Sequence, residues 1–313
     1  MGQPFQLPEG REFDVVGFGT NAVDYLVRVG EFPKFGGKAE LNSYSIEPGG
    51  EIASTMVGLQ RLGFRTAYSG SFGDDEAGRI GLSSLENAGI DVTHARVVKD
   101  AQTQVAFILV DERSGERTIL WRRDEKLKHM GVADAPIDLA SRCCILHITP
   151  HDTETCIKLA SAGKDAGTIV SLDIDNVFDG IDDLLPLVDI CLASEEFPAK
   201  LMGKQCPAEA LAEIHSRYGC AVVGMTLGDK GSLVFCDGRL IETPASPVPG
   251  GCVDTTGAGD AFRTGFLYGV LSDAAAEECC RYANAVAALK CRTPGARQGL
   301  PQAEEITTLL KKI

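Results

Sequence analysis

The sequence predicts an α/β fold: a doubly wound, mostly parallel sheet flanked by helices, with a small β-sheet lid. Two observations lead to this class. After residue 140, short apolar strands alternate with helical segments of roughly ten to fifteen residues, which is the spacing of parallel βαβ units. Earlier in the chain, segments at about 33–47 and 101–122 look extended instead. No linker or repeat interrupts the 313 residues, so we expect one domain, 1–313, with the lid segments inserted in it.

The N-terminal part begins with a strand and reaches its first helix after a pair of glycines. Asp14–Gly19 (DVVGFG) is an apolar run typical of a buried strand, and Leu41–Ile46 looks extended. In the segment EIASTMVGLQRLG, which follows residue 50, apolar side chains recur at helical spacing. Gly63 stands where such a helix would end.

The middle and C-terminal parts continue with a hairpin and then with regular alternation. The hairpin pairs Thr103–Val110 with Arg117–Arg122 across the turn-rich loop DERSGE. The strands expected after it are Cys144–Ile148, Thr168–Asp173, Asp189–Ala193 and Ala221–Thr226, followed by a second hairpin of Gly231–Cys236 and Leu240–Glu242. Three helices are expected to close the chain, at 257–271, 273–291 and 302–312.

Composition excludes several classes of protein. The net charge is −14 and the isoelectric point lies near 4.8, so the overall field repels nucleic acids and anionic membranes. No apolar run approaches the ~20 residues that a membrane-spanning helix needs. The N-terminus has no signal-peptide pattern, and the eleven cysteines include no C-x-x-C spacing. We expect a cytoplasmic protein with reduced thiols and no nucleic-acid or membrane partner.

The stretch Asp254–Phe262 (DTTGAGDAF) has the residue types that bind an anion and activate a hydroxyl. Gly257, Ala258 and Gly259 let the backbone approach a ligand closely, and the first N–H groups of the following helix lack partners within it. These donors and the helix dipole make an anion site. Asp260 lies in this positive field, where we expect its carboxylate to stay ionised and to accept a proton. Spacing alone also fits a glycine-rich turn with Asp260 as a simple helix cap.

Several motifs together resemble one family. DTTGAGDAF is similar, over nine unbroken residues, to the C-terminal signature of the ribokinase-like (PfkB) family of carbohydrate and nucleoside kinases. Gly17–Asp24 (GFGTNAVD) resembles the family's first strand and loop, and Gly49-Gly50 resembles its first signature. Gly73–Gly78, the run TLGDKG from Thr226, and Asn284 follow in family order. The resemblance covers nearly the whole chain, nearest to fructokinase and 2-keto-3-deoxygluconate kinase members.

The resemblance implies ATP as the phosphoryl donor and Mg²⁺ as the ion that bridges its phosphates. The implied ATP-binding residues are Thr226, Gly228, Gly231 and Asn284. The transferred phosphate would lie over the backbone of residues 257–260. Asp254 and Thr256 resemble positions that hold a monovalent cation in some relatives, which raises the possibility of K⁺ as a further cofactor.

The resemblance also implies a sugar site. The sugar would lie between Asp24, the glycines at 49 and 50, and Asp260, under the small sheet, with Asp260 as the general base. Arg123 follows the second hairpin strand, where relatives that phosphorylate ketoses or keto-acid sugars place a substrate-binding arginine. A surface charge at Arg123 is an equally good interpretation of the sequence.

Two positions depart from the family pattern. Ser54 stands near a position where the family often has Asn. The N-x-x-E motif, whose glutamate organises Mg²⁺ through water, would begin at Ser194, and its acidic position holds Phe197. Glu196 is the candidate replacement, and a solvated carboxylate at a helix start is the alternative.

Two other nucleotide-binding folds are disfavoured. Gly17-x-Gly19-x-x-Ala22 imitates a dinucleotide fingerprint, but no clear helix follows it directly, and no G-x-x-x-x-G-K-[ST] motif occurs. The resemblance implies a sugar kinase, and the hairpin end GERTILW, which is similar to fructokinase-like members, makes a fructose-like hexose the first candidate substrate. The alternatives are 2-keto-3-deoxygluconate, ribose or a nucleoside, and, outside enzymes, a non-catalytic scaffold of the same fold. A homodimer through the lid is expected because exposed strand edges pair.

Overall fold

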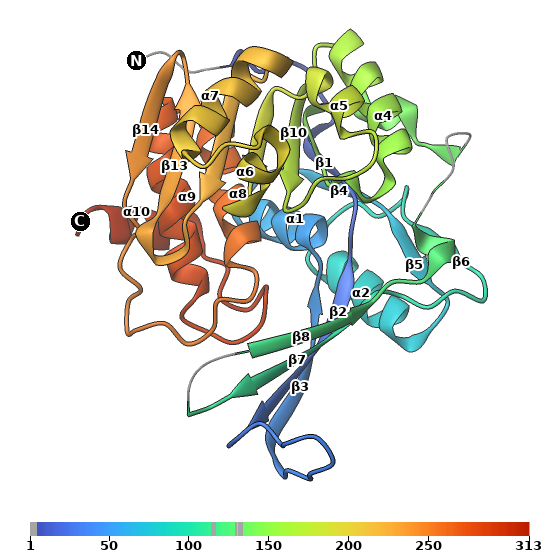
Figure 1. Cartoon of the computed structure of the whole chain (residues 1–313). Coiled ribbons are helices and arrows are strands. Elements are labelled where there is room, and N and C mark those ends of the chain that lie inside the picture. The colour runs from blue at the N-terminus through green and yellow to red at the C-terminus, as the bar shows by residue number, and fades with distance from the viewer. Residues whose placement is uncertain (1–4, 114–116, 129, 131–133, 313) are drawn as a thin grey trace.

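The computed structural model describes residues 5–113, 117–128, 130 and 134–312, and within these residues one large sheet and two small ones are formed (Figure 1). The large sheet has eight strands in the order β14-β13-β12-β11-β10-β9-β1-β4. In that order, the strands are β14 (Arg239–Thr243), β13 (Ser232–Cys236), β12 (Val222–Thr226), β11 (Ile190–Ala193), β10 (Ile169–Ile174), β9 (Cys143–Ile148), β1 (Phe13–Phe18) and β4 (Thr66–Ser69). All neighbours from β4 to β12 are parallel, and β13 and β14 add an antiparallel hairpin.

Each face of the large sheet packs against its own layer of helices, which explains why its central strands are apolar throughout. Neighbouring residues alternate between the two cores: Val15 and Ile145 lie in one, and Val16 and Leu146 in the other. The first core includes α1 (Glu51–Arg61), α2 (Glu76–Asn87), α8 (Ala258–Leu271), α9 (Ala276–Lys290) and α10 (Ala303–Leu310). The second includes α3 (Ile137–Ala140), α4 (Thr153–Asp165), α5 (Ile181–Leu184), α6 (Glu196–Met202) and α7 (Pro207–Tyr218).

A four-stranded sheet projects from the carboxyl side of the large sheet (Figure 1). Its order is β3 (Leu41–Gly49), β2 (Ala22–Val29), β7 (Val105–Asp111) and β8 (Arg117–Arg122). We call it the small sheet. Its buried core consists of Leu26, Ala106 and Ile108. The strands β5 (Ser71–Gly73) and β6 (Arg96–Val98) form a separate two-stranded sheet, and both come between β3 and β7 in the sequence.

The predicted fold class is confirmed, and the strands and helices expected after residue 140 are present within a few residues of their predicted bounds. The expectation for the small sheet was incomplete. Its central strand β2 was not predicted, and within the segment 33–47 only the part from Leu41 onward is strand. The predicted hairpin of β7 and β8 is present, although residues 114–116 of its loop lie outside the described residues.

Three observations concern the classes of protein that the sequence disfavoured. A strand, β2, begins at Ala22 where a dinucleotide-binding fold would need a helix. All eleven cysteines are free, and nine of them are buried. In the described part of the chain, no helix has the length and apolar character needed to cross a bilayer.

Candidate active site

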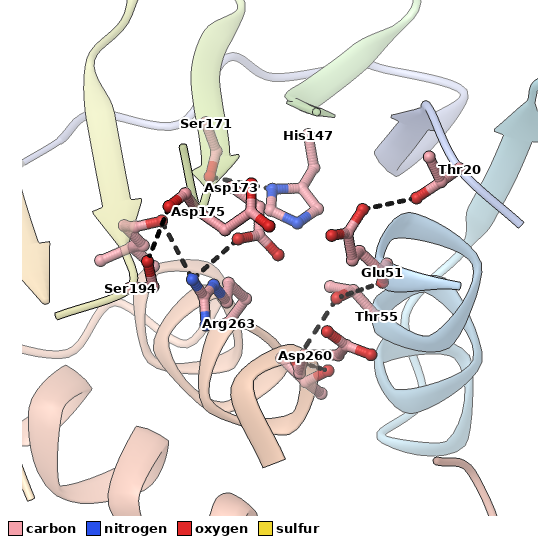
Figure 2. Close-up of polar contacts among 12 residues, drawn as sticks. Thr20, Glu51, Thr55, His147, Ser171, Asp173, Asp175, Ser194, Asp260 and Arg263 are labelled. Atoms are coloured by element: carbon pink, nitrogen blue, oxygen red, sulfur yellow. Dashed lines mark hydrogen bonds and ion pairs between the residues drawn. The ribbon is translucent and has the colours of Figure 1, made fainter. Parts of the chain in front are cut away.

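Polar side chains converge where the carboxyl ends of the central strands meet the N-termini of α1 and α8 (Figure 2). Carboxyl ends of parallel strands are the usual ligand-binding edge of an open α/β sheet. Among the side chains there are Glu51 on α1, Asp173 at the end of β10, and Asp260 and Arg263 on α8. Figure 2 shows Asp173 and Arg263 facing each other, with Glu51 and Asp260 on the side of α1.

The glycine-rich turn predicted to bind an anion lies at the N-terminus of α8, and one of its expected donors already has an acceptor. Gly257 has a left-handed φ of 74°, and a Cβ there would lie 2.8 Å from the Cα of Ala296, so both conformation and space require glycine. The N–H of Ala258 donates to the carbonyl of Thr255 at 3.1 Å. Among the described residues, no acceptor is found for the N–H groups of Gly259 and Asp260. These two are therefore the donors left for a ligand.

Asp260 is positioned by its backbone. Its carbonyl accepts hydrogen bonds from Thr264 Oγ1 at 2.9 Å, one turn further along α8, and from Thr55 Oγ1 on α1 at 3.3 Å. The two hydroxyls connect the starts of α1 and α8. The side chain is consequently held at the junction of the two helices.

The expectation that Asp260 stays ionised is opposed by its surroundings. Burial raises the pKa of Asp260 well above its usual range, and the charges of Asp173 and Glu51 raise it further, while Arg263 lowers it. Desolvation and neighbouring carboxylates thus act against the positive field of the helix N-terminus.

Asp173 and Arg263 form a buried ion pair. Arg263 Nη2 lies 2.8 Å from Asp173 Oδ1, and the two side chains are only 5% and 7% exposed. Arg263 also donates to the carbonyl of Leu192 at 3.3 Å. Burial raises the pKa of Asp173 to about 7 despite this partner, with Glu51 adding to the rise. Removing either member would leave an uncompensated buried charge.

Two further polar groups border this pair. Thr20 Oγ1 donates to Glu51 Oε2 at 2.6 Å, and burial raises the pKa of Glu51. His147, at the end of β9, lies 3.0 Å from Ser171 Oγ through its Nδ1, and burial lowers its pKa to about 3. His147 is therefore neutral, and the edge of the sheet is dominated by carboxylates.

Among the residues predicted to bind the sugar, Asp24 and Gly49 lie in close contact. Asp24, on β2, is buried, and a Cβ on Gly49 would lie 2.3 Å from its Oδ2. Gly50 has a φ of 91°, and its Cβ would lie 2.4 Å from the Cα of Asn21. Burial raises the pKa of Asp24 to about 6, Arg297 opposes this, and Asp254 and Glu47 add to it. Both glycines are needed for this close approach.

The residues predicted to bind ATP are also brought together. Thr226 ends β12, and the short turn from Gly228 to Gly231 returns the chain into β13. Both glycines have positive φ angles, 61° and 102°. Asn284, on α9, donates to Ser232 Oγ at 2.9 Å, which fixes α9 to the start of β13.

A comparison with protein families decides the classification. The family model for pfkB family carbohydrate kinases matches residues 13–303. The chain belongs to the PfkB family. As a member of it, the protein is an ATP-dependent phosphotransferase of the sugar and nucleoside kinase type.

Named relatives cover the length of this PfkB kinase. The ATP-dependent ribose-1-phosphate kinase of Halopiger xanaduensis is 29% identical, covering 92% of this chain and 95% of its own. The ribokinase of Haemophilus influenzae is also 29% identical, covering 94% and 97%. Among solved structures, Arabidopsis thaliana ribokinase complexed with ribose and ATP has a TM-score of 0.81 at 26% identity, covering 96% and 99%.

Arg123 of this PfkB kinase lies near the site. It lines a small cavity with Phe18, Ser71 and His151, and its Nη2 donates to the carbonyl of Leu127 at 2.9 Å. Burial lowers its pKa, while Tyr68 and Glu51 oppose that shift. The predicted role in binding substrate stays a prediction.

Glu196 does not join the carboxylates of the site. Its side chain is 73% exposed and lies 2.7 Å from Lys200 Nζ, one turn along α6. Phe197, at the family's acidic position, is fully buried in the second core. The structure therefore favours the alternative interpretation of Glu196 as a solvated carboxylate at a helix start.

Arg297 is a residue of the site that sequence reasoning missed. It is buried in the loop after α9 and donates to Ser54 Oγ at 3.2 Å, to Ser84 Oγ at 2.6 Å and to the carbonyl of Gly49. Ser54, which Arg297 contacts, stands near the position where the family often has Asn. No local pattern in the sequence distinguishes it from a surface arginine.

Proposed function

We propose that this kinase transfers the terminal phosphoryl group of ATP to a hydroxyl of a sugar, with Asp260 as the general base. The observation that carries the proposal is the junction of α1 and α8. There, a carboxylate and two backbone N–H donors without acceptors, those of Gly259 and Asp260, occupy the same helix turn. Phosphoryl transfer needs this combination: donors for the charged oxygens and a base for the nucleophile.

The proposed reaction follows from these positions. Asp24 binds sugar hydroxyls and presents one of them to Asp260. The hydroxyl oxygen bonds to phosphorus as the bond from phosphorus to the departing ADP oxygen breaks, and the hydroxyl proton passes to Asp260. The small sheet, including Arg123 after β8, would close over the sugar and exclude water, which otherwise competes as the nucleophile.

ATP would lie against Thr226, Gly228, Gly231 and Asn284, with its terminal phosphate on the turn 257–260. The Mg²⁺ that accompanies ATP needs only one or two carboxylates besides the phosphates. Within the described residues, no three His, Cys, Asp or Glu side chains are grouped to hold a metal by themselves. Asp175 is exposed just beyond β10 and offers a carboxylate oxygen, a ligand suited to Mg²⁺. The bound Mg²⁺ would reduce the negative charge on the phosphates.

Asp254 and Thr256 fit a monovalent-cation site only in part. Thr256 Oγ1 is buried without a partner among the described residues. The carboxylate of Asp254, however, accepts the N–H groups of Thr256 and Gly295, both at 2.8 Å, and its carbonyl accepts Lys290 Nζ at 2.9 Å. The Lys290 ammonium already supplies positive charge there, so the proposed reaction includes no step that depends on K⁺.

The substrate is proposed as a class, an unphosphorylated sugar. A fructose-like hexose stays the first prediction. Ribose is an equal candidate, because one named relative is a ribokinase and the solved Arabidopsis enzyme is complexed with ribose. The panel also contains 2-keto-3-deoxygluconate, ribose 1-phosphate and adenosine.

The test is sugar-dependent ADP release with Mg²⁺ across this panel, for the wild type and Asp260→Asn. We expect one sugar to give turnover and the variant to lose at least ~10²-fold of it. Asp260→Asn removes a carboxylate from an acidic group, so its thermal unfolding temperature should not fall. Asp165→Asn, an exposed change at the last residue of α4, is the matched control and should retain full turnover.

Two results would contradict the proposal. Asp260→Asn with wild-type turnover would remove the base assignment. ATP binding without turnover on any sugar of the panel would favour the non-catalytic scaffold instead.

A further inference from the structure

We propose that Arg263 contacts the transferred phosphoryl group and supplies the protein's own positive charge to it, with Asp173 as the residue that positions the guanidinium. This inference deepens the proposed function and rests on it. Three observations carry it: where the guanidinium lies, which of its donors are unused, and the charge of its surroundings.

The guanidinium lies against the anion turn. Arg263 is one helical turn beyond Gly259, and helical side chains lean toward the N-terminus of their helix. A Cβ placed on Gly259 would stand only 2.7 Å from Arg263 Nη1. The guanidinium is therefore next to the backbone whose N–H groups have no acceptor. A phosphoryl group bound to those N–H groups would lie within reach of Arg263.

Arg263 has hydrogen-bonding capacity to spare. Its two interactions, with Asp173 Oδ1 and the carbonyl of Leu192, both use Nη2. Nε is buried, and no acceptor for it exists among the described residues. A ligand oxygen bound at Nη1, the nitrogen beside Gly259, would use a donor that neither of these two interactions occupies, and a planar guanidinium binds phosphate oxygens in pairs.

The surroundings need a cation. Glu51, Asp173, Asp175 and Asp260 gather at this edge, and Arg263 is paired with Asp173 among them (Figure 2). A terminal phosphate would bring further negative charge into the same space. Without Arg263, the carboxylates would repel the phosphoryl group that the anion turn is shaped to bind.

Asp173 explains how the guanidinium is held ready. The pair is almost completely buried, so the arginine has few alternative conformations in the empty site. A charged group fixed before the ligand arrives costs little reorganisation during the reaction.

The test compares Asp173→Asn with the double variant Asp173→Asn/Arg263→Met. Arg263→Met alone would strand a buried carboxylate and could fail to fold, whereas the Asn background removes that charge. Asp173→Asn leaves the guanidinium buried without its partner, so we expect the double variant to unfold at a temperature no lower than that of Asp173→Asn. Its kcat should be lower by ~10²–10³-fold, which is typical of losing one donor to a transition-state oxyanion. Asp173→Asn/Arg263→Lys, which keeps the charge without the planar fork, should fall between the two.

Nucleotide binding gives a second readout. In the same background, Arg263→Met should weaken binding of a non-hydrolysable ATP analogue by about tenfold or more, and leave ADP binding unchanged, because only ATP carries the terminal phosphate. Equal kcat values for Asp173→Asn and the double variant would overturn the proposal, as would equal losses for ATP analogue and ADP. If the wild type turned over no sugar at all, the proposed function would fail, and the nucleotide comparison would still decide the role of Arg263.

Discussion

At the carboxyl edge of the large sheet, Asp173 and Arg263 are almost completely buried and paired at 2.8 Å, whereas all six residues of β8 in the small sheet are exposed. The two regions face the same site and are stabilised differently. The large sheet is buried on both faces, and its polar groups are fixed by one another. Among the described residues, the buried apolar cluster of the small sheet consists of Leu26, Ala106 and Ile108.

This difference separates two tasks. Phosphoryl transfer requires charged groups held in fixed positions. The carboxyl edge of the large sheet, with Glu51, Asp173, Asp260 and Arg263, provides them, and we call it the floor of the site. Substrate choice and association require a surface that can move and be altered, and a thin sheet provides that. Changes in the floor should therefore alter kcat strongly, and changes in the small sheet should alter sugar binding or assembly.

The largest effect is expected where the two regions meet, at Gly49. A Cβ there would lie 2.3 Å from Asp24 Oδ2, so Gly49→Ala should displace Asp24 from the sugar. We expect kcat/KM for the sugar to fall by ~10²-fold, as for other small displacements of positioning groups. The KM for ATP should be unchanged. Steady-state kinetics with both substrates measures this.

Gly30→Ala is the matched control, because the nearest atom to a Cβ at Gly30, Asn42 Nδ2, is 3.8 Å away. It should keep wild-type kinetics. If Gly49→Ala retained wild-type kcat/KM, Asp24 could not be a sugar ligand held by this close approach.

The next effect concerns the pH dependence of stability. The pKa of Asp24 is raised by burial to about 6 in the folded chain, against about 4 when unfolded. The folded state therefore binds this proton more tightly, and stability from it is lost as the pH rises from about 4 through 6. The Asp24→Asn variant has no carboxyl group at this position, so its stability does not fall with pH for this reason. Its free energy of unfolding, relative to the wild type, should rise by about 1 kcal/mol between pH 5 and pH 7.5.

Urea unfolding of both proteins at the two pH values measures the difference. Arg297, Asp254 and Glu47 are the charged groups that act on Asp24, and they are present in both proteins. A difference between wild type and variant that did not change with pH would contradict the assignment of a raised pKa to Asp24.

A smaller effect is expected on assembly. Phe107 and Leu120 are paired across β7 and β8, Tyr25 stacks on Phe107 at 4.9 Å, and this face of the small sheet is open, with Phe107 45% and Leu120 60% exposed. We propose that a second copy of the chain covers it. Leu120→Lys should then convert a dimer to a monomer, as measured by light scattering. Leu240→Lys, a comparable exposed change on β14, should not. A monomeric wild type would refute the dimer.

The floor could be predicted from sequence where its signals are local. The glycine turn before α8, the helix after Gly50 and the buried strands each have a pattern within about fifteen residues. β2 was missed because its identity depends on pairing with β7, which lies some eighty residues further along the chain. A central strand of a small sheet has no strong period of its own.

The charged groups of the floor could not be predicted for a related reason. Glu51, Asp173 and Arg263 lie on three separate elements, and only the tertiary fold brings them together. The forces on the pKa of Asp260 could not be predicted for the same reason. Its own helix lowers this pKa, whereas burial and residues distant in sequence raise it.

The smallest effect is expected for Glu196, at the start of α6. Glu196 is an acidic residue at the carboxyl edge, like Asp175, but its exposed side chain is paired with Lys200. An exposed pair of this kind contributes little, roughly 0–1 kcal/mol. Glu196→Gln should therefore change kcat and the Mg²⁺ concentration for half-maximal turnover by less than about twofold, whereas Asp175→Asn should raise that concentration several-fold. If Glu196→Gln instead raised the Mg²⁺ requirement as strongly as Asp175→Asn, the start of α6 would belong to the catalytic edge together with Asp175, and the ion pair with Lys200 would not keep Glu196 out of it.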